Sequence, residues 1–248
     1  MGAVFHRRRY FAPFPRGLSM VVRAVVLDIE GTIAPIAFVR DILFPYARKH
    51  LADFLADHGD EPAVASEIAA VRQAAPGMDV TKALLGWMDL DLKIPPLKAL
   101  QGMIWQTGYD RGELRGRIYP DVPPCLRAWR ERGLALYIYS SGSVPAQRLL
   151  LGHSDAGDLC PLFSGFFDSK IGAKREAASY QAIAAQIGVD ATDCLFLSDV
   201  EAELDAARRA GWRAAQVVRE NDGTVGSTRF PNCAILPDAD ALLESWNT

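Results

Sequence analysis

Short apolar runs alternate with longer amphipathic stretches along most of the chain. Five of the runs predict strands that are buried on both faces, as in a parallel sheet. These runs are Val21–Leu27, Leu134–Tyr139, Gly165–Phe167, Cys194–Leu197 and Ala214–Val218. Helical patterns lie between them, at about Asp121–Arg132, Val144–Leu151, Arg175–Ile187 and Glu201–Ala210. Strands that alternate with helices are typical of an α/β fold with a Rossmann-like parallel sheet.

The segment from about Ile33 to Tyr119 breaks this alternation, because it holds helical patterns and no strand candidate. One apolar stripe at helical spacing is Leu43, Ala47, Leu51 and Leu55, and further helical patterns cover Asp60–Ala75, Val80–Leu90 and Pro96–Thr107. We predict an all-helical cap inserted after the first strand. Two independent domains are the alternative, but the alternation resumes after the segment. The expected boundaries are 21–33 and 119–248 for the core and 34–118 for the cap.

Residues 1–20 are basic and aromatic and lack the apolar core and cleavage site of a secretory signal. We expect a disordered extension, unless the chain begins at Met20. A nucleic-acid contact by Arg7–Arg9 is the less favoured alternative, because three arginines in a flexible tail are usually solvated. No apolar run reaches the roughly 18 residues that a membrane span needs.

Composition narrows the class of protein. The 248 residues are 50% hydrophobic and 23% charged, with a net charge of −3, which is ordinary for a globular chain. Both signs are interspersed, so we expect no partner among nucleic acids or membranes. The cysteines form neither a CxxC pair nor a metal-finger pattern; they are Cys125, Cys160, Cys194 and Cys233. They predict unpaired side chains in a reducing compartment, and we expect a cytoplasmic protein.

Candidate chemistry begins directly after the first predicted strand, at Asp28-Ile29-Glu30-Gly31-Thr32. Residues two apart in an extended chain point to the same side, so Asp28 and Glu30 face one crevice. Two carboxylates in such a place are costly unless a cation or hydrogen-bond donors compensate them. The motif alone is weak, because short acidic strings also occur in ordinary loops.

Two later strands are also followed by polar groups. Ser140-Ser141-Gly142-Ser143 offers hydroxyl and backbone N–H groups that suit an oxyanion, although a plain capped turn is the simpler interpretation. Lys174 precedes a predicted helix and would place a positive charge on a phosphate. Lys170 is the competing candidate, and a solvated surface lysine is the alternative for both.

Asp199 follows the fourth strand directly, as Asp28 follows the first. Glu203 and Asp205, on the next helix, are interpreted as acidic residues that complement the helix dipole. Ligands bind at the carboxyl edge of open α/β sheets. If the strand order is 3-2-1-4-5, the first and fourth strands are neighbours, and Asp28 and Asp199 converge on one hard cation. Oxygen ligands of this kind suit Mg²⁺.

In this combination the chain resembles the haloacid dehalogenase superfamily of phosphohydrolases, whose four ordered motifs match Asp28–Thr32, Ser140, Lys174 and Asp199. The helical insertion resembles that of the members with an all-helical cap, and the resemblance covers the chain from about residue 21. It implies hydrolysis of a phosphate ester through an aspartyl-phosphate on Asp28.

A closer resemblance is to the acireductone synthases, the bifunctional enolase-phosphatases of methionine salvage. It rests on D-x-E where most relatives have D-x-D, and on the strings YIYSSGSVPAQRLLLGHS, FDSKIGAK and LFLSDVEAELDAA. It implies a monomer that enolises 2,3-diketo-5-methylthiopentyl 1-phosphate and dephosphorylates it to the dihydroxy acireductone.

Carried over by position, the resemblance assigns catalysis to Asp28 and Glu30. It implies Mg²⁺ binding by Asp28, Glu30 and Asp199, although most relatives offer a backbone carbonyl at the position of Glu30. It implies substrate contact by Ser140, Ser141 and Lys174.

Other functions stay open at this point. A monofunctional phosphatase or phosphomutase would use the same fold. A phospho-acceptor receiver needs no insertion of about 85 residues, and a non-catalytic binding protein does not need the full set of acid, hydroxyl and lysine. In the cap, pocket candidates are Trp87, Met88, Trp105 and Tyr109, although such residues at helical spacing more often pack in a core.

Overall fold

The structure is a computed structural model that describes residues 22–246. The extension expected at residues 1–20, with Arg7–Arg9, lies outside the described residues.

A six-stranded sheet forms the centre of the molecule, and all of its strand pairs are parallel. The strands are β1 (Ala24–Leu27), β2 (Ala135–Tyr139), β3 (Gly165–Phe167), β4 (Cys194–Ser198), β5 (Arg213–Val217) and β6 (Asn232–Cys233). Their order is β3-β2-β1-β4-β5-β6. The expected α/β class and the order 3-2-1-4-5 are therefore confirmed, with β6 as an additional edge strand.

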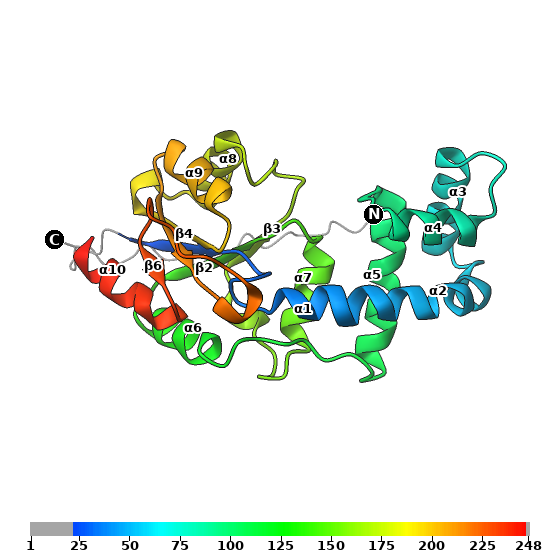
Figure 1. Ribbon diagram of the computed structural model, residues 1–248, viewed down its shortest axis with the longest axis horizontal. Helices are drawn as coiled ribbons and strands as arrows, with labels where there is room; N and C mark the ends of the chain where they lie inside the picture. Colours follow the sequence, from blue (N-terminus) through cyan, green and yellow to red (C-terminus); the bar gives the residue numbers. More distant parts are fainter. Residues whose placement is uncertain (1–21, 247–248) are drawn as a thin grey trace, which may run out of the picture.

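Helices cover both faces of the sheet, so the core has three layers (Figure 1). One cluster of buried side chains joins Val25 and Leu27 of β1 to α6 (Val122–Glu131), α7 (Val144–Gly152) and α10 (Ala239–Ser245). A second cluster joins Ala24 and Val26 to α8 (Ala177–Ile187) and α9 (Glu201–Arg209). Alternate strand residues point to opposite faces, which is why a strand covered by helices on both sides is apolar throughout. Short 3₁₀ turns complete the core at η2 (Cys160–Leu162), η3 (Ala191–Asp193), η4 (Glu220–Asp222) and η5 (Leu236–Asp238).

A helical segment follows β1 and lies at one end of the sheet (Figure 1). It begins with α1 (Ile36–Phe38), the π-helical turn η1 (Val39–Leu43) and α2 (Phe44–His58), which run into one another. It continues with α3 (Pro62–Ala74), α4 (Val80–Asp89) and α5 (Pro95–Asp110). Residues 36–110 contain no strand. The π turn has no signal in the hydrophobic pattern.

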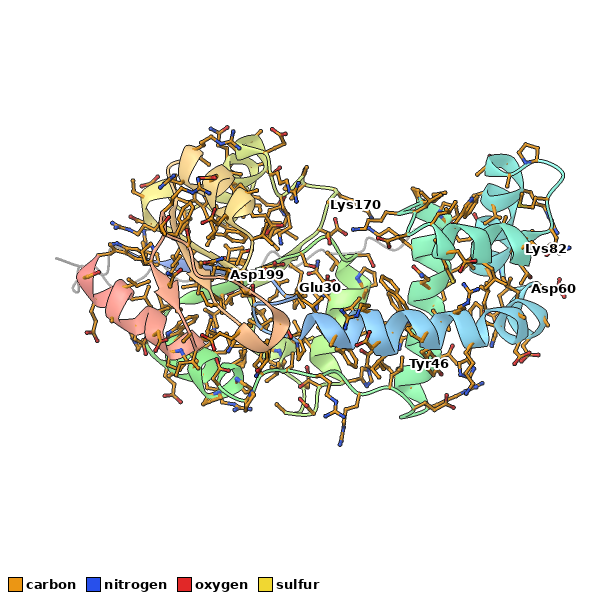
Figure 2. The ribbon with its side chains drawn as sticks, in the orientation of Figure 1. Glu30, Tyr46, Asp60, Lys82, Lys170 and Asp199 are labelled. Carbon is orange, nitrogen blue, oxygen red and sulfur yellow. The ribbon has the colours of Figure 1, made fainter. Side chains whose placement is uncertain are left out.

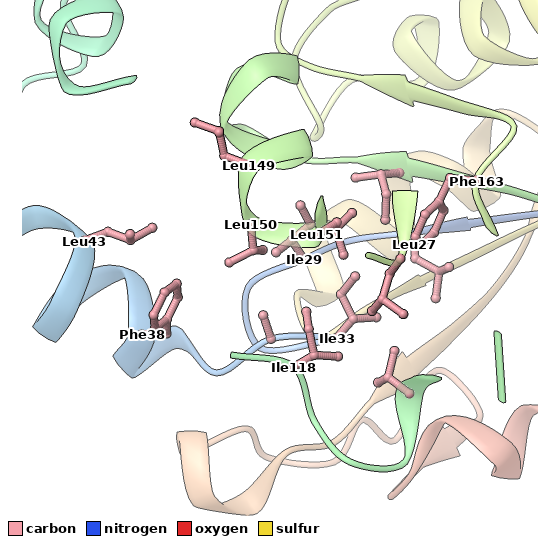
Figure 3. Close-up of a cluster of buried hydrophobic side chains, with 14 of the residues drawn as sticks. Leu27, Ile29, Ile33, Phe38, Leu43, Ile118, Leu149, Leu150, Leu151 and Phe163 are labelled. Atoms are coloured by element: carbon pink, nitrogen blue, oxygen red, sulfur yellow. The ribbon is translucent and has the colours of Figure 1, made fainter. Parts of the chain in front are cut away.

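Buried side chains continue from the sheet into the helical segment. Figure 3 draws Phe38 and Leu43, from the start of that segment, together with Leu150 of α7 and Ile29 after β1. These residues belong to the larger cluster, and α5 also packs against α7. Each buried leucine or phenylalanine contributes about 1.5–3 kcal/mol. Apolar packing therefore contributes to holding the helices beside the edge of the sheet.

The four cysteines are unpaired, as expected; Cys160 is half-buried and the other three are buried. Within residues 22–246, no helix combines the length and the apolar character that crossing a membrane requires.

Candidate active site

Asp28 stands where β1 ends, and its side chain is almost fully enclosed, with 7% exposed. Its backbone N–H donates to the Leu197 carbonyl of β4 at 2.9 Å, which extends the ladder one residue beyond the strand. The carboxylate accepts from the Ile29 backbone N–H at 2.7 Å and from the Ser198 hydroxyl at 3.3 Å. The sheet therefore holds this carboxylate in one position.

Lys174 is the cation of the site. Its Nζ lies 2.6 Å from Asp28 Oδ1 and 2.6 Å from Glu203 Oε2, and 10% of the side chain is exposed. Burial lowers the pKa of Lys174, but the attraction of Asp28 and Glu203 outweighs it, so the net pKa is raised and the ammonium stays charged. Lys170, the competing candidate, is exposed on the loop after β3, and its backbone N–H donates to Asp168 Oδ1 at 2.9 Å. Of the two lysines, the structure brings Lys174 to the site.

Glu203 was not among the residues that the sequence assigned to the site. It stands in the first turn of α9, as its interpretation as a helix-dipole residue expects, and it also contacts Lys174. It is 9% exposed, and besides the lysine it accepts a hydrogen bond from the Ser198 hydroxyl at 2.9 Å. Burial raises the pKa of its carboxyl, and the neighbouring Asp28 raises it further. Asp205, by contrast, pairs with arginines at the surface. The available signal was spacing, since Glu203 precedes the buried Ala207 by four residues and so shares its face of α9.

Asp199 lies beside the loop that follows β1. Its backbone N–H donates to Thr32 Oγ1 at 3.1 Å, and its carbonyl accepts from Gln216 Nε2 at 2.8 Å. Gly31 has a φ of +71°, and a Cβ there would lie 2.6 Å from Asp199 Oδ2, so glycine is needed for this approach. Burial, together with the negative charge of Asp28, raises the pKa of the Asp199 carboxyl to about 7.

These carboxylates fit a hard cation. Asp28 and Asp199 follow the paired strands β1 and β4, and Asp199 Oδ1 is buried with no hydrogen-bond partner. An orphaned carboxylate oxygen of this kind suits Mg²⁺, which prefers one or two carboxylates with other oxygen ligands. No group of three His, Cys, Asp or Glu side chains in residues 22–246 forms a metal cluster. The magnesium roles of Asp28, Glu30 and Asp199 stay predictions.

Glu30 lies between the sheet and the helical segment (Figure 2). Its side chain is half-buried. Burial raises the pKa of its carboxyl, and repulsion from Asp28 adds to the shift, while Lys174 and Lys93 oppose it. A carboxyl beside a cavity is a candidate for proton transfer to and from a bound substrate.

The serine turn after β2 lies at the same edge. Ser140 is buried, and its hydroxyl accepts from the Gly142 backbone N–H at 3.2 Å. Ser141 is exposed, and its carbonyl accepts from Lys98 of α5 at 3.1 Å. This contact joins the helical segment to the turn. Both serines line the cavity described below.

Gln147 holds this turn in place and was not identified from the sequence. Ser143 caps α7, as expected, and accepts from the Ala146 backbone N–H at 3.4 Å. One turn later, Gln147 Nε2 donates to the carbonyls of Gly142 at 2.7 Å and Phe167 at 2.9 Å. The side chain is 2% exposed. It therefore ties the turn after β2 to the end of β3.

A cavity of about 500 Å³ lies between the sheet edge and the helical segment. The core contributes Glu30, Ser140, Ser141 and Gln147 among other residues. The helical segment contributes apolar side chains and four cations, including Leu43, Phe44, Met88, Trp105, Arg40, Arg48, Lys93 and Lys98. Of the four pocket candidates, Met88 and Trp105 line the cavity, and Trp87 and Tyr109 do not. Trp105 and Tyr109 also belong to the hydrophobic core cluster, against which Trp87 and Met88 pack.

Comparison with known proteins gives the same family throughout. A sequence profile of the haloacid dehalogenase-like hydrolases matches residues 22–211. Proteins named Enolase-phosphatase E1 from Acidiphilium cryptum and Gluconacetobacter diazotrophicus are each 53% identical to this chain. The first match covers 90% of this chain and 95% of the relative, and the second covers 88% and 92%.

Among solved structures, the UTR4 protein of Saccharomyces cerevisiae is 31% identical with a TM-score of 0.75. The match covers 87% of this chain and 98% of the yeast chain. These matches identify a hydrolase, and not the phospho-acceptor receiver or the non-catalytic binding protein that the sequence left open. On its sequence and its fold, the chain belongs to the enolase-phosphatase family of the haloacid dehalogenase-like hydrolases.

Proposed function

We propose that the protein is a magnesium-dependent enolase-phosphatase of methionine salvage. Its substrate would be 2,3-diketo-5-methylthiopentyl 1-phosphate, and its products the dihydroxy acireductone and phosphate. One observation carries this proposal: Asp28 is enclosed between Lys174 and Ser198 at the end of β1, two residues from a Glu30 that lines a cavity of about 500 Å³. The names of the bacterial relatives support the choice of reaction.

Phosphoryl transfer mainly needs alignment and charge neutralisation. The Asp28 carboxylate forms a bond to phosphorus, and the bond from phosphorus to the substrate oxygen breaks, which leaves an aspartyl-phosphate. Lys174 offsets the negative charge of the transferring group. Ser140 and the backbone N–H groups of its turn bind phosphate oxygens.

Glu30 acts as the general acid and then as the general base. Glu30 lines the cavity, where its carboxyl donates a proton to the leaving oxygen, and the carboxylate that remains then takes a proton from the water that hydrolyses the aspartyl-phosphate. Mg²⁺, held by Asp28, Asp199 and an oxygen of Glu30, would supply positive charge at the phosphoryl group. The orphaned oxygen of Asp199 supports this assignment.

The same proposal covers the organisation of the chain. Residues 34–118 would act as the cap over a core of 21–33 and 119–248, since the cavity is lined from both parts. We expect a cytoplasmic monomer that acts on a small phosphorylated diketone and binds neither nucleic acid nor membranes.

The test is turnover of the diketone phosphate by the purified protein, with Mg²⁺ and with a chelator. Phosphate release is followed by colour and the enediol by its ultraviolet absorbance. We expect both products with Mg²⁺ and neither with the chelator. Phosphate release from other monoesters without any enediol would indicate a monofunctional phosphatase, and no phosphate from any monoester would contradict the proposal.

A further inference from the structure

Two connecting segments join the helical cap to the core, and one turn of the core binds both of them. Residues 31–36 lead into α1, and residues 111–121 lead from α5 back to α6. The Asp222 carboxylate, in η4, accepts from the Ile36 backbone N–H at 2.9 Å and from the Tyr119 hydroxyl. The segments are also joined directly, because the Tyr119 backbone N–H donates to the Ile33 carbonyl at 3.0 Å. In Figure 1 this part of the chain, drawn in orange, lies against the start of α1.

Arg219, three residues earlier, contacts the same two segments and is 6% exposed. Its guanidinium donates twice to the Thr32 carbonyl, at 2.9 and 3.1 Å, and forms a bidentate pair with Asp121 at 2.9 and 3.0 Å. It also lies 4.1 Å from the centroid of the Tyr119 ring. Bidentate charged pairs combine strength with a fixed geometry. Arg219 and Asp222 together therefore hold the outgoing and the returning segment at one point.

Arg219 and Asp222 differ in the parts of the molecule to which their partners belong. Arg219 donates to the Thr32 carbonyl, and the Thr32 hydroxyl accepts from the Asp199 backbone N–H. Arg219 is therefore connected to the loop after β1, which carries Glu30. Asp222 is bonded to the first residue of α1 and to the returning segment. Loss of Asp222 therefore loosens the cap without removing a group that faces the substrate.

We propose that Arg219 and Asp222 form a hinge clamp, a pair of positioning residues that sets how often the cap stands over the carboxyl edge of the sheet. The kinetic part of this inference rests on the proposed function. A ligand binds with an apparent affinity reduced by the fraction of molecules that are competent to bind it. A looser hinge lowers that fraction and leaves the chemistry of the closed site unchanged. The Michaelis constant rises, while the turnover number at saturation changes little.

The experiment compares Asp222→Ala and Tyr119→Phe with the wild type and uses Glu220→Ala as the matched control, since Glu220 is an exposed carboxylate in the same turn. Steady-state phosphate release from the diketone phosphate gives kcat and KM. Hydrogen exchange of the backbone amides in residues 32–38 and 115–121, without substrate, reports the hinge directly.

For Asp222→Ala we expect KM to rise about tenfold, kcat to stay within about twofold, and exchange to quicken about tenfold in both segments, because two hydrogen bonds to a charged group are lost. Tyr119→Phe removes one of those bonds, so about a threefold change is expected. Glu220→Ala should match the wild type in both measurements.

Three outcomes would overturn the hinge clamp: a fall in kcat at unchanged KM, faster exchange confined to the segment of Ile36, or equal effects in Glu220→Ala. If Asp222→Ala does not fold, Tyr119→Phe decides by the same measurements. If the wild type does not turn over the diketone phosphate, the proposed function fails, and hydrogen exchange still decides. Faster exchange in both segments then supports the clamp, and unchanged exchange overturns it.

Discussion

The two walls of the cavity are built in different ways. The core wall includes polar groups that directly follow strands, such as Glu30 after β1 and Ser140 after β2, beside residues of α7. The cap wall consists of helix side chains that combine apolar surface with cations, such as Trp105 and Lys98. The core wall is suited to chemistry on a phosphate, and the cap wall to selecting the rest of the substrate. Variants on the two walls should therefore fail in different ways.

The largest effect is expected for Asp28, the proposed nucleophile on the core side. Asp28→Asn should lower phosphate release by at least about 1,000-fold, because the amide cannot attack phosphorus. The fold should persist, since asparagine has the same shape and Lys174 keeps its pair with Glu203. Ultraviolet absorbance measures enolisation separately, and Glu30→Gln serves as the companion variant. If Asp28→Asn still forms the enediol and Glu30→Gln does not, the half-reactions use different groups. Normal phosphate release by Asp28→Asn would refute the mechanism.

Lys174 and Lys170 provide a matched pair on one loop. Lys174→Met should lower kcat/KM about 100-fold, because the transferring phosphoryl group loses its cation. The variant also leaves the carboxylates of Asp28 and Glu203 together without their shared partner. Lys170→Met should have less than about a twofold effect, since that side chain is exposed. Equal losses in the two variants would argue that the loop as a whole matters, and not the charge of Lys174.

The predictable part of the fold is the part with a strong local signal. The apolar runs identify β1 to β5, and helices α6 to α9 begin and end within about two residues of the amphipathic patterns. The strand β6 has two residues and the π turn η1 continues a helix on both sides, so neither has a period that a pattern can show. Apolar runs locate strands, whereas the pairing of a short edge strand depends on its neighbours.

The same distinction holds for the site. Asp28, Glu30, Ser140 and Asp199 were identified because strand ends converge at one sheet edge. Glu203 and Gln147 lie on helices, where a carboxylate or an amide usually faces water, and tertiary contacts turn them to the site. Arg219 and Asp222 follow β5 and bind segments far away in the sequence. A residue that only positions other residues has no sequence motif by which it can be predicted.

The stabilisation of the protein by Mg²⁺ should depend on pH through the ionisation of Asp199. An acidic group whose pKa is raised to about 7 on folding stabilises the metal-free protein below its ordinary pKa, and this contribution is lost as the pH rises through about 7. The metal needs the ionised carboxylate, so its apparent affinity should be about tenfold weaker at pH 6 than at pH 8. At a concentration 100 times the dissociation constant at pH 8, Mg²⁺ should add about 2.7 kcal/mol to the free energy of unfolding there, and about 1.4 kcal/mol at pH 6.

Thermal unfolding with and without Mg²⁺ at the two pH values measures this difference. Asp199→Asn is the control, because it keeps the shape of the side chain and removes the titrating group. We expect the variant to show little Mg²⁺ stabilisation at either pH. A wild-type shift that is the same at pH 6 and pH 8 would contradict the assignment of Asp199 to the metal.

The smallest effect is expected on the cap wall, where two tryptophans can be compared. Trp105 lines the cavity, and its indole N–H donates to the Leu43 carbonyl of the π turn at 2.8 Å. Trp129 lies in the core, and its indole N–H donates to Asp240 at 2.8 Å. Phenylalanine in either place leaves a polar partner unpaired, so each variant should lose about 1–3 kcal/mol of folding stability. The stability loss therefore does not separate them.

The kinetics should separate the two variants. Trp105→Phe should raise KM about threefold with little change in kcat, because it removes apolar contact made equally to bound substrate and transition state. Trp129→Phe should leave both constants unchanged, since Trp129 is not part of the cavity lining. A fall in kcat for Trp105→Phe would mean that the cap wall takes part in the chemistry, and the division of labour between the two walls would then be wrong.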